Sequence, residues 1–156
     1  MRILVTSDTH GDWDNLRRAI MAQPSAQVAI HLGDGEEDMS RLRHSFPEKT
    51  FLQVGGNCDW GSSLPSQGEY DAEGVKIFYT HGHLYAVKTT DEKVISAGRD
   101  RGAKIVLYGH THIPREDYVD GIYVMNPGRL GGWEPSYGVI DITEQGIVLN
   151  LIKLPV

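Results

Sequence analysis

The sequence predicts an α/β fold that begins with parallel strands. Three short apolar runs, residues 2–7, 27–32 and 50–54, alternate with two segments whose apolar residues recur at helical spacing. Runs that are apolar on both faces are typical of parallel strands buried between other layers. Later short runs, separated by turns that contain glycine, predict further strands. The chain therefore opens as a β-α-β-α-β unit, which usually places ligands at the carboxyl ends of its strands.

The two helices of this opening unit have capping and stop signals. Asp12 is expected to cap the first helix, with Asn15 three positions later, and Pro24 ends it. The second helix is expected over residues 37–46, because acidic residues stand at its start and basic residues near its end, as the helix dipole favours. Pro47 then stops it.

The second half of the chain begins with a loop and becomes rich in strands. Residues 60–67 are rich in Gly, Ser and Pro and predict a loop that is a candidate lid. A hairpin is expected from residues 69–72 and 75–80, followed by a helix over 89–101 and a strand over 104–108. The remaining runs predict a meander of four strands, at residues 116–119, 122–125, 137–142 and 147–154.

Length and composition limit the class of protein. With 156 residues the chain is of single-domain size, so we expect one domain over residues 1–156. The 21 acidic residues outnumber the 15 basic ones and no dense basic run occurs, which disfavours strong binding of nucleic-acid polymers. Cys58 is the one cysteine, and no apolar stretch approaches the roughly 18 residues of a membrane span. We therefore expect a cytoplasmic protein with no membrane attachment.

Metal-ligating side chains follow the ends of successive apolar runs. Asp8 and His10 are two residues apart, so in an extended backbone their side chains would point the same way. Carboxylates, an amide and imidazoles suit manganese, iron, zinc, nickel or cobalt better than calcium. The candidate metal ligands are Asp8, His10, Asp34, Asn57, His81, His110 and His112.

Seven such groups are too many for one four-coordinate ion and suit two ions that share a carboxylate. Two ions ~3.5–4 Å apart can bind two phosphate oxygens, lower the pKa of a water molecule and stabilise developing negative charge. The pattern therefore predicts hydrolysis of phosphate esters with two divalent ions, of which manganese is the first expectation.

The motifs resemble those of one known family. Asp8 with His10, Gly33-Asp34, Gly56-Asn57 with Asp59, His81 at a strand end, Gly109-His110 with His112, and Asn126-Pro127-Gly128 match the calcineurin-like metallophosphoesterases in order. The short length is similar to the small prokaryotic phosphodiesterase branch. The resemblance implies a sandwich of two mixed β-sheets flanked by helices, in four layers α-β-β-α. It also implies a reaction by attack of a metal-bound hydroxide on a small or nucleotide-like diester.

The resemblance further implies which residues hold each ion. One ion would be held by Asp8, His10, Asp34 and His112. Asp34 would bridge to the second ion, which Asn57, His81 and His110 also hold.

One position departs from the pattern of the family. Many members carry a histidine, thought to protonate the leaving group, where this chain has Cys58. A neutral thiol is a weak donor, and nearby metal charge favours the thiolate, which cannot donate. We therefore expect faster hydrolysis of diesters with acidic leaving groups. The candidate catalytic residues are Asn57, Cys58, Asp59, which could orient the Asn57 loop, and His83, the alternative proton donor.

Two other functions compete with a phosphodiesterase. The resemblance also covers the retromer scaffold subunit, a non-enzymatic member that binds partner proteins, although here every matched ligand position is filled. A phosphomonoesterase usually needs additional cationic groups, and we expect no arginine beside the matched motifs. Self-association into a homo-oligomer is also open, because apolar residues of the late strands could form either core or interface.

Several conspicuous residues have structural interpretations beside the functional ones. Asp12 is expected to be a helix cap, and His31 a hydrogen-bonded residue of the core or beside the ligands. Asn126 could contact the ligands, although Asn-Pro-Gly is a turn sequence. The tryptophans could line a pocket or be ordinary core and surface residues; they are Trp13, Trp60 and Trp133.

Overall fold

The structure of the protein is a computed structural model that describes residues 1–155. Its elements are β1 (Arg2–Thr6), α1 (Trp13–Ala22), β2 (Val28–His31), α2 (Glu36–Leu42), β3 (Thr50–Gln53), β4 (Gln67–Ala72), β5 (Val75–Thr80), α3 (Glu92–Asp100), β6 (Ile105–Leu107), β7 (Arg115–Val119), β8 (Ile122–Asn126), β9 (Ser136–Thr143) and β10 (Gly146–Lys153), with short 3-10 helices at Arg43–Ser45 and His83–Tyr85.

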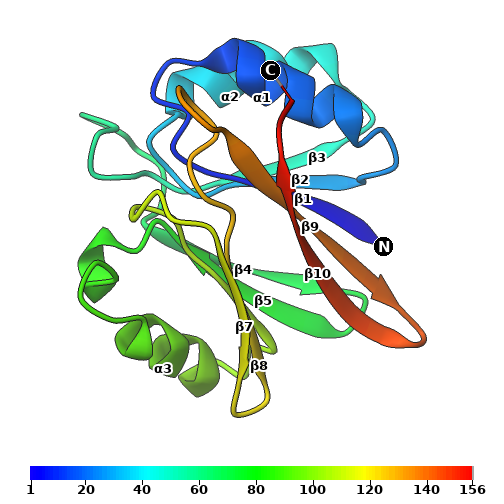
Figure 1. Cartoon of the computed structure of the whole chain (residues 1–156), viewed down its shortest axis with the longest axis vertical. Coiled ribbons are helices and arrows are strands. Elements are labelled where there is room, and N and C mark those ends of the chain that lie inside the picture. Colours follow the sequence, from blue (N-terminus) through cyan, green and yellow to red (C-terminus); the bar gives the residue numbers. More distant parts are fainter. Residues whose placement is uncertain (156) are drawn as a thin grey trace.

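The strands form two five-stranded sheets that pack face to face. Their orders are β10-β9-β1-β2-β3 and β4-β5-β6-β8-β7, and each sheet mixes parallel and antiparallel pairs. Helices α1 and α2 cover the outer face of the first sheet, and α3 covers the outer face of the second (Figure 1). The predicted sandwich of two mixed sheets flanked by helices is confirmed.

The inner strands are apolar on both faces because each face meets another layer. In β1, Ile3 and Val5 belong to the cluster between the two sheets, whereas Leu4 packs toward α1 and α2. In β6, Ile105 and Leu107 face the sheet-sheet core and Val106 faces α3. The interpretation of the first apolar runs as buried parallel strands therefore holds for β1 and β2.

The sheet positions of the late strands differ from the sequence prediction. The predicted meander is wrong, because the four strands form two hairpins that belong to different sheets. Strand β8 pairs in parallel with β6, whereas β9 pairs antiparallel with β1. Similarly, β3 is an edge strand with partly exposed side chains rather than a buried one. Turn signals mark hairpins, but they do not show which sheet a hairpin joins.

Two helix boundaries also differ from the predictions. Helix α2 ends at Leu42, and a 3-10 turn continues the segment to Ser45. Helix α3 begins at Glu92 rather than at residue 89, and the carboxylate of Asp91 pairs with Arg115 instead of capping the helix. None of the helices within residues 1–155 has both the length and the apolar character needed to cross a membrane.

Gly98 provides a test of the packing between α3 and the second sheet. Alanine inside a helix normally stabilises it by about 1 kcal/mol relative to glycine. Here a Cβ at Gly98 would overlap Val106 of β6, so we expect Gly98→Ala to lower the free energy of unfolding by about 1–3 kcal/mol. Urea unfolding measures the change, with Ser96→Ala on the exposed face of α3 as control. An unchanged or raised stability of Gly98→Ala would contradict this packing.

Candidate metal centre

Five of the predicted ligands lie in loops with a left-handed backbone. Their φ angles are 55° at Asp8, 45° at His10, 59° at Asp34, 67° at His110 and 63° at His112. The expectation that Asp8 and His10 lie on an extended backbone is therefore wrong, since β1 ends at Thr6. Non-glycine residues in this region cost of order 1–3 kcal/mol each and cluster at functional sites.

Backbone hydrogen bonds between neighbouring loops hold the strained conformation. The N–H of Asp8 donates to the carbonyl of Gly33 at 3.0 Å, and the N–H of His10 donates to the carbonyl of Asp34 at 2.9 Å. Close approach of the loops requires glycine at some positions. A Cβ at Gly56 would overlap the Asp34 carboxylate, and one at Gly109 would overlap the Ser7 hydroxyl.

The first ligand group surrounds the buried carboxylate of Asp8. Its Oδ2 accepts hydrogen bonds from the Ser7 hydroxyl at 2.5 Å and from the N–H of His110 at 3.1 Å. Its Oδ1 lies 3.2 Å from Nε2 of His112 and 3.4 Å from Nε2 of His10. One carboxylate oxygen is thus held by the protein, and the other faces two imidazoles.

Asp34 connects the first group to the second. Its Oδ1 accepts a hydrogen bond from the N–H of Cys58 at 2.7 Å. Its Oδ2 lies 3.3 Å from Nε2 of His81 and 3.7 Å from Nε2 of His10. Burial acts to raise the pKa of Asp34, but the neighbouring His81 ring and the hydrogen bond from the N–H of Cys58 outweigh it, so this pKa lies well below its usual range.

The second group is arranged around the fully buried ring of His81. Its Nδ1 lies 2.7 Å from the carbonyl of Leu32, so Nδ1 carries the hydrogen and donates it. Nε2 points to Oδ1 of Asn57 at 2.9 Å and to Nδ1 of His110 at 3.1 Å, and its lone pair is available to a cation when the ring is neutral. All seven predicted ligands therefore lie in one connected set of contacts.

The donor atoms of both groups fit divalent cations. Asp8 Oδ1 is buried and has no hydrogen-bond partner among residues 1–155. The lone pairs of Asn57 and Asp34 converge on that of His81, an arrangement of acceptors that a shared cation stabilises. Three sets of donor atoms lie close enough to hold an ion: Asp8 with His10 and His112, His10 with Asp34 and Cys58, and Asp34 with His81 and His110. The donor set therefore indicates divalent metal ions.

Asp59 contacts the backbone of two ligand loops. Oδ2 accepts the N–H of Asp34 and the N–H of Gly56, both at 2.8 Å. Oδ1 accepts the N–H of Gly35 at 3.1 Å and that of Glu36 at 3.2 Å. The carboxylate therefore ties the loop after β2 to the loop after β3, which places Asp34 near Asn57. We infer that Asp59 positions these ligands rather than touching substrate.

His31 contacts the loops that carry the candidate ligands and is not itself one of those ligands. It is fully buried, and burial lowers its pKa to about 4, so the ring is neutral. Nδ1 accepts the N–H of Gly33, and Nε2–H lies 3.1 Å from the hydroxyl of Thr9, which donates to Asp38 at 2.6 Å. Asp38 also accepts the N–H of Gly11. This chain of hydrogen bonds fixes the loop that carries Asp8 and His10.

Cys58 lies beside Asn57, and His83 lies beside His81 and His110. The Cys58 thiol is exposed and lies 3.5 Å from Nδ2 of Asn57. Partial desolvation of the sulfur and the neighbouring Asp34 carboxylate raise the pKa of this thiol. His83 begins a short 3-10 helix. Its ring lies 5.3 Å from the ring of His81 and 6.1 Å from that of His110.

The remaining candidates divide between structural and surface positions. Asp12 caps α1 by accepting the N–H of Asn15, as predicted. Asn126 is buried, and its amide donates to the carbonyl of Gly109 and to Thr111, which orients the loop of His110 and His112. Trp13 lies under the guanidinium of Arg41, whereas Trp60 and Trp133 are exposed and line cavities beside the ligands.

Arg129 is the residue that sequence reasoning missed. It lines one cavity with His10 and His112, although 17 residues separate it from His112 in the chain. The expectation that no arginine stands beside the motifs is therefore wrong, because Arg129 directly follows Asn126-Pro127-Gly128 in the sequence and lies beside His10 and His112 in the structure. The loop between β8 and β9 brings it there, because the N–H of Leu130 donates to the carbonyl of Ser7 and that of Gly131 to the carbonyl of Asp8. The signal that could have found Arg129 is its place directly after the matched motif Asn126-Pro127-Gly128.

Comparison with known proteins gives consistent similarities. The family model of the calcineurin-like phosphoesterase superfamily domain matches residues 1–145. The probable metallophosphoesterase YsnB of Bacillus subtilis is 32% identical over 131 residues, covering 83% of this chain and 75% of that protein. The phosphodiesterase YfcE of Escherichia coli is 28% identical over 182 residues, covering 99% and 92%. A solved archaeal phosphodiesterase has a TM-score of 0.77 at 26% identity, covering 99% of this chain and 100% of that one.

Asp59→Asn tests the positioning role of the Asp59 carboxylate. The amide cannot accept with both of its terminal atoms, so the hydrogen bonds to one ligand loop are lost. Partners of this kind typically change metal affinity by about 10–100-fold, and we expect a loss in that range. Competition with a metal-binding dye measures the affinity. Glu37→Gln, an exposed acid of α2, is the control for the loss of one negative charge; equal effects of both substitutions would contradict a positioning role.

Proposed function

The chain belongs to the calcineurin-like phosphoesterase superfamily and is a metal-dependent phosphoric ester hydrolase, and we propose that it hydrolyses phosphodiesters with two divalent ions. The single observation that carries the proposal of two ions is the pair of donor groups that meet at Asp34. The names of the relatives YfcE and the archaeal enzyme support a diester as substrate.

The proposed division of ligands follows the two groups. Asp8, His10 and His112 would hold one ion, and Asn57, His81 and His110 the other, with Asp34 shared between them. Two divalent ions held there would supply two cationic centres for phosphate oxygens and lower the pKa of a water molecule. Manganese is the proposed ion, because carboxylate, amide and imidazole donors together suit it.

The protein's own residues keep the donors in place and in the correct protonation state. The Leu32 carbonyl holds the Nδ1 hydrogen of His81, so that Nε2 stays free to bind. The Ser7 hydroxyl and the His110 N–H hold one oxygen of Asp8 and leave the other facing the centre. Asn57 stands at the open side of the second group and is exposed, so its amide can also contact a phosphate oxygen.

The alternative functions are distinguished by the residues of the centre. A non-enzymatic scaffold would not need seven intact donors, and all seven are present here. A phosphomonoesterase gains support from Arg129, because a cation beside His10 and His112 can meet the additional charge of a monoester. The location of the protein in the cytoplasm and its self-association stay predictions.

Metal removal and resupply test the diesterase proposal. Metal-stripped protein is resupplied in turn with manganese, nickel, zinc or magnesium, and hydrolysis of bis(p-nitrophenyl) phosphate is compared with that of p-nitrophenyl phosphate. We expect metal-dependent turnover that favours the diester and a loss of at least about tenfold in Asn57→Ala, since the substitution removes one ligand.

Asn150→Ala on the exposed side of β10 is the control for the asparagine substitution. Absence of turnover with every ion, while two ions bind per chain, would overturn the enzymatic proposal and favour the scaffold. Faster hydrolysis of the monoester would favour the phosphomonoesterase.

A series of aryl and alkyl diesters tests the effect of Cys58 on leaving-group protonation. Because a thiol is a weak proton donor, we expect the rate to fall steeply as the pKa of the leaving alcohol rises. If His83 supplies protons instead, His83→Ala slows the poorest leaving groups most. His44→Ala, an exposed histidine outside the centre, is the control. A flat dependence that persists in His83→Ala would show that neither residue limits protonation.

A further inference from the structure

Three cavities border the metal centre and share lining residues. A cavity of about 430 Å³ lies on the side of Trp60 and includes His10 and Gly11. A second, of about 590 Å³, continues from His10 and Gly11 to His112 and Arg129. The third, of about 580 Å³, begins at His112 and Arg129 and extends along β10. The shared residues make these cavities one continuous trough that passes over the donor atoms.

The two ends of the trough differ in charge. The end at Trp60 is lined by Glu36, Glu37 and Asp38, and no basic side chain other than His10 lines it. The end along β10 is lined by Arg129 and Lys153, with Glu134 as its one acid. This basic end stands out in a chain whose formal net charge is −6. A substrate with one anionic end would therefore bind in one orientation.

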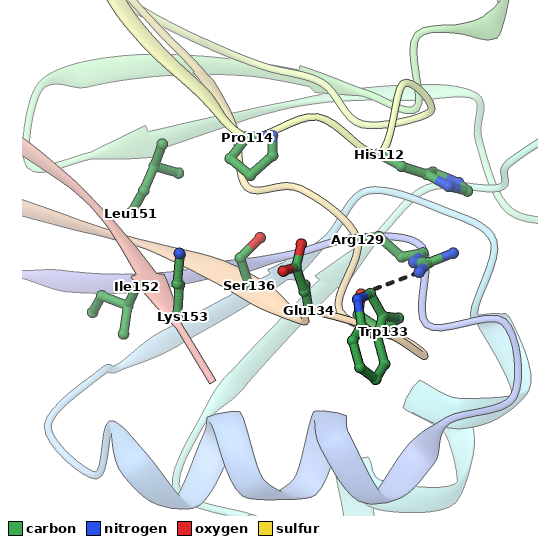
Figure 2. Close-up of a pocket in the computed structure, with 9 residues that line it drawn as sticks. All are labelled: His112, Pro114, Arg129, Trp133, Glu134, Ser136, Leu151, Ile152 and Lys153. Atoms are coloured by element: carbon green, nitrogen blue, oxygen red, sulfur yellow. Dashed lines mark hydrogen bonds between the residues drawn. The ribbon is translucent and has the colours of Figure 1, made fainter. Parts of the chain in front are cut away.

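Arg129 is placed and oriented for an anion. Its Nη2 donates to the carbonyl of Trp133 at 3.1 Å, and it forms no ion pair with an acidic side chain among residues 1–155. Figure 2 shows the guanidinium and the Trp133 ring at the end of the cavity near His112, whereas Leu151, Ile152 and Lys153 line the opposite end. The Trp133 side chain is 80% exposed, so its face is open to a planar group.

We propose that the substrate is an unsymmetrical diester in which one substituent carries a second phosphate, bound by Arg129 in the cavity along β10. A phosphate fits because the planar guanidinium donates two parallel hydrogen bonds to its oxygens. The other, uncharged substituent extends toward Trp60, since the acids there repel a second anion. This inference rests on the proposed diesterase.

The second phosphate takes no part in the reaction. The oxygen of a water molecule forms a bond to the bridging phosphorus, and one P–O ester bond of that phosphate breaks. A proton from the water passes to the departing oxygen. One product is an alcohol and the other a phosphomonoester, and the second phosphate stays on its own substituent. The reaction needs no oxidant, and water is its one other reactant.

A pair of thymidine dinucleotides tests the inference, one with a 5′-hydroxyl and the other with a 5′-phosphate. The metal-loaded enzyme is assayed with both by chromatography of the products. We expect kcat/KM to be about tenfold higher for the 5′-phosphorylated dinucleotide, as for a charge-assisted hydrogen-bonded contact. Arg129→Gln should reduce the preference to about one, whereas Arg129→Lys should keep part of it. Lys93→Gln, an exposed cation of α3 outside the trough, controls for net charge.

Each outcome separates this inference from the proposed diesterase. Equal kcat/KM for the two dinucleotides, or an unchanged preference in Arg129→Gln, overturns the inference while bis(p-nitrophenyl) phosphate is still hydrolysed. An equal loss in Arg129→Gln on bis(p-nitrophenyl) phosphate and on both dinucleotides also overturns it, because Arg129 would then act at the bridging phosphate.

Binding decides the question if no diester is hydrolysed. Calorimetry on the metal-loaded protein compares thymidine 3′,5′-bisphosphate with thymidine 3′-monophosphate, which lacks the second phosphate. A tighter binding of the bisphosphate that Arg129→Gln abolishes supports the anion site in the absence of turnover. Equal affinities in the unsubstituted protein overturn it.

Discussion

The structure depends on the burial of two carboxylates among imidazole lone pairs. Asp8 is fully buried, and its free oxygen faces His10 and His112 with no hydrogen-bond donor of its own. Burying an ionised carboxylate is costly unless an opposite charge or donors compensate it. Asp34 is buried nearby and faces His81. Cations at the two donor groups would offset both charges, and the surrounding loops are built so that the donors stay together.

The sandwich supplies the rigidity that these loops need. Six of the seven ligands follow β1, β2, β5 and β6, inner strands of the two sheets whose ends are fixed by the core on both sides, and Asn57 follows the edge strand β3. Left-handed backbone at the ligands is costly by itself, and hydrogen bonds between loops offset it. Asp59 contributes most of these bonds for the loops after β2 and β3. The same carboxylate that looked like a catalytic candidate in the sequence thus acts on the backbone.

The substrate trough arises from the order of the strands. Because β9 pairs antiparallel with β1, the loop that precedes β9 lies beside the carboxyl end of β1. This is the end that Asp8 follows. Arg129 and Trp133 lie in that loop and so reach the same centre as residues from the first quarter of the chain. The opposite wall comes from the segment after β3 and from α2, which carries acidic residues in its first turn. Topology therefore sets a difference of charge across the metal centre.

The sequence by itself determined the strands of the opening unit, the Asp12 cap, the hairpin of β4 and β5, and the set of candidate ligands. These features depend on local patterns: apolar periodicity, turn residues and side-chain chemistry at strand ends. Only the tertiary structure decided that the late hairpins belong to different sheets, that Asp8 and His10 meet through left-handed loops, and that Arg129 borders the centre. Each of these depends on pairing between segments far apart in the chain, and local residue preferences carry no information about which distant strand is the partner.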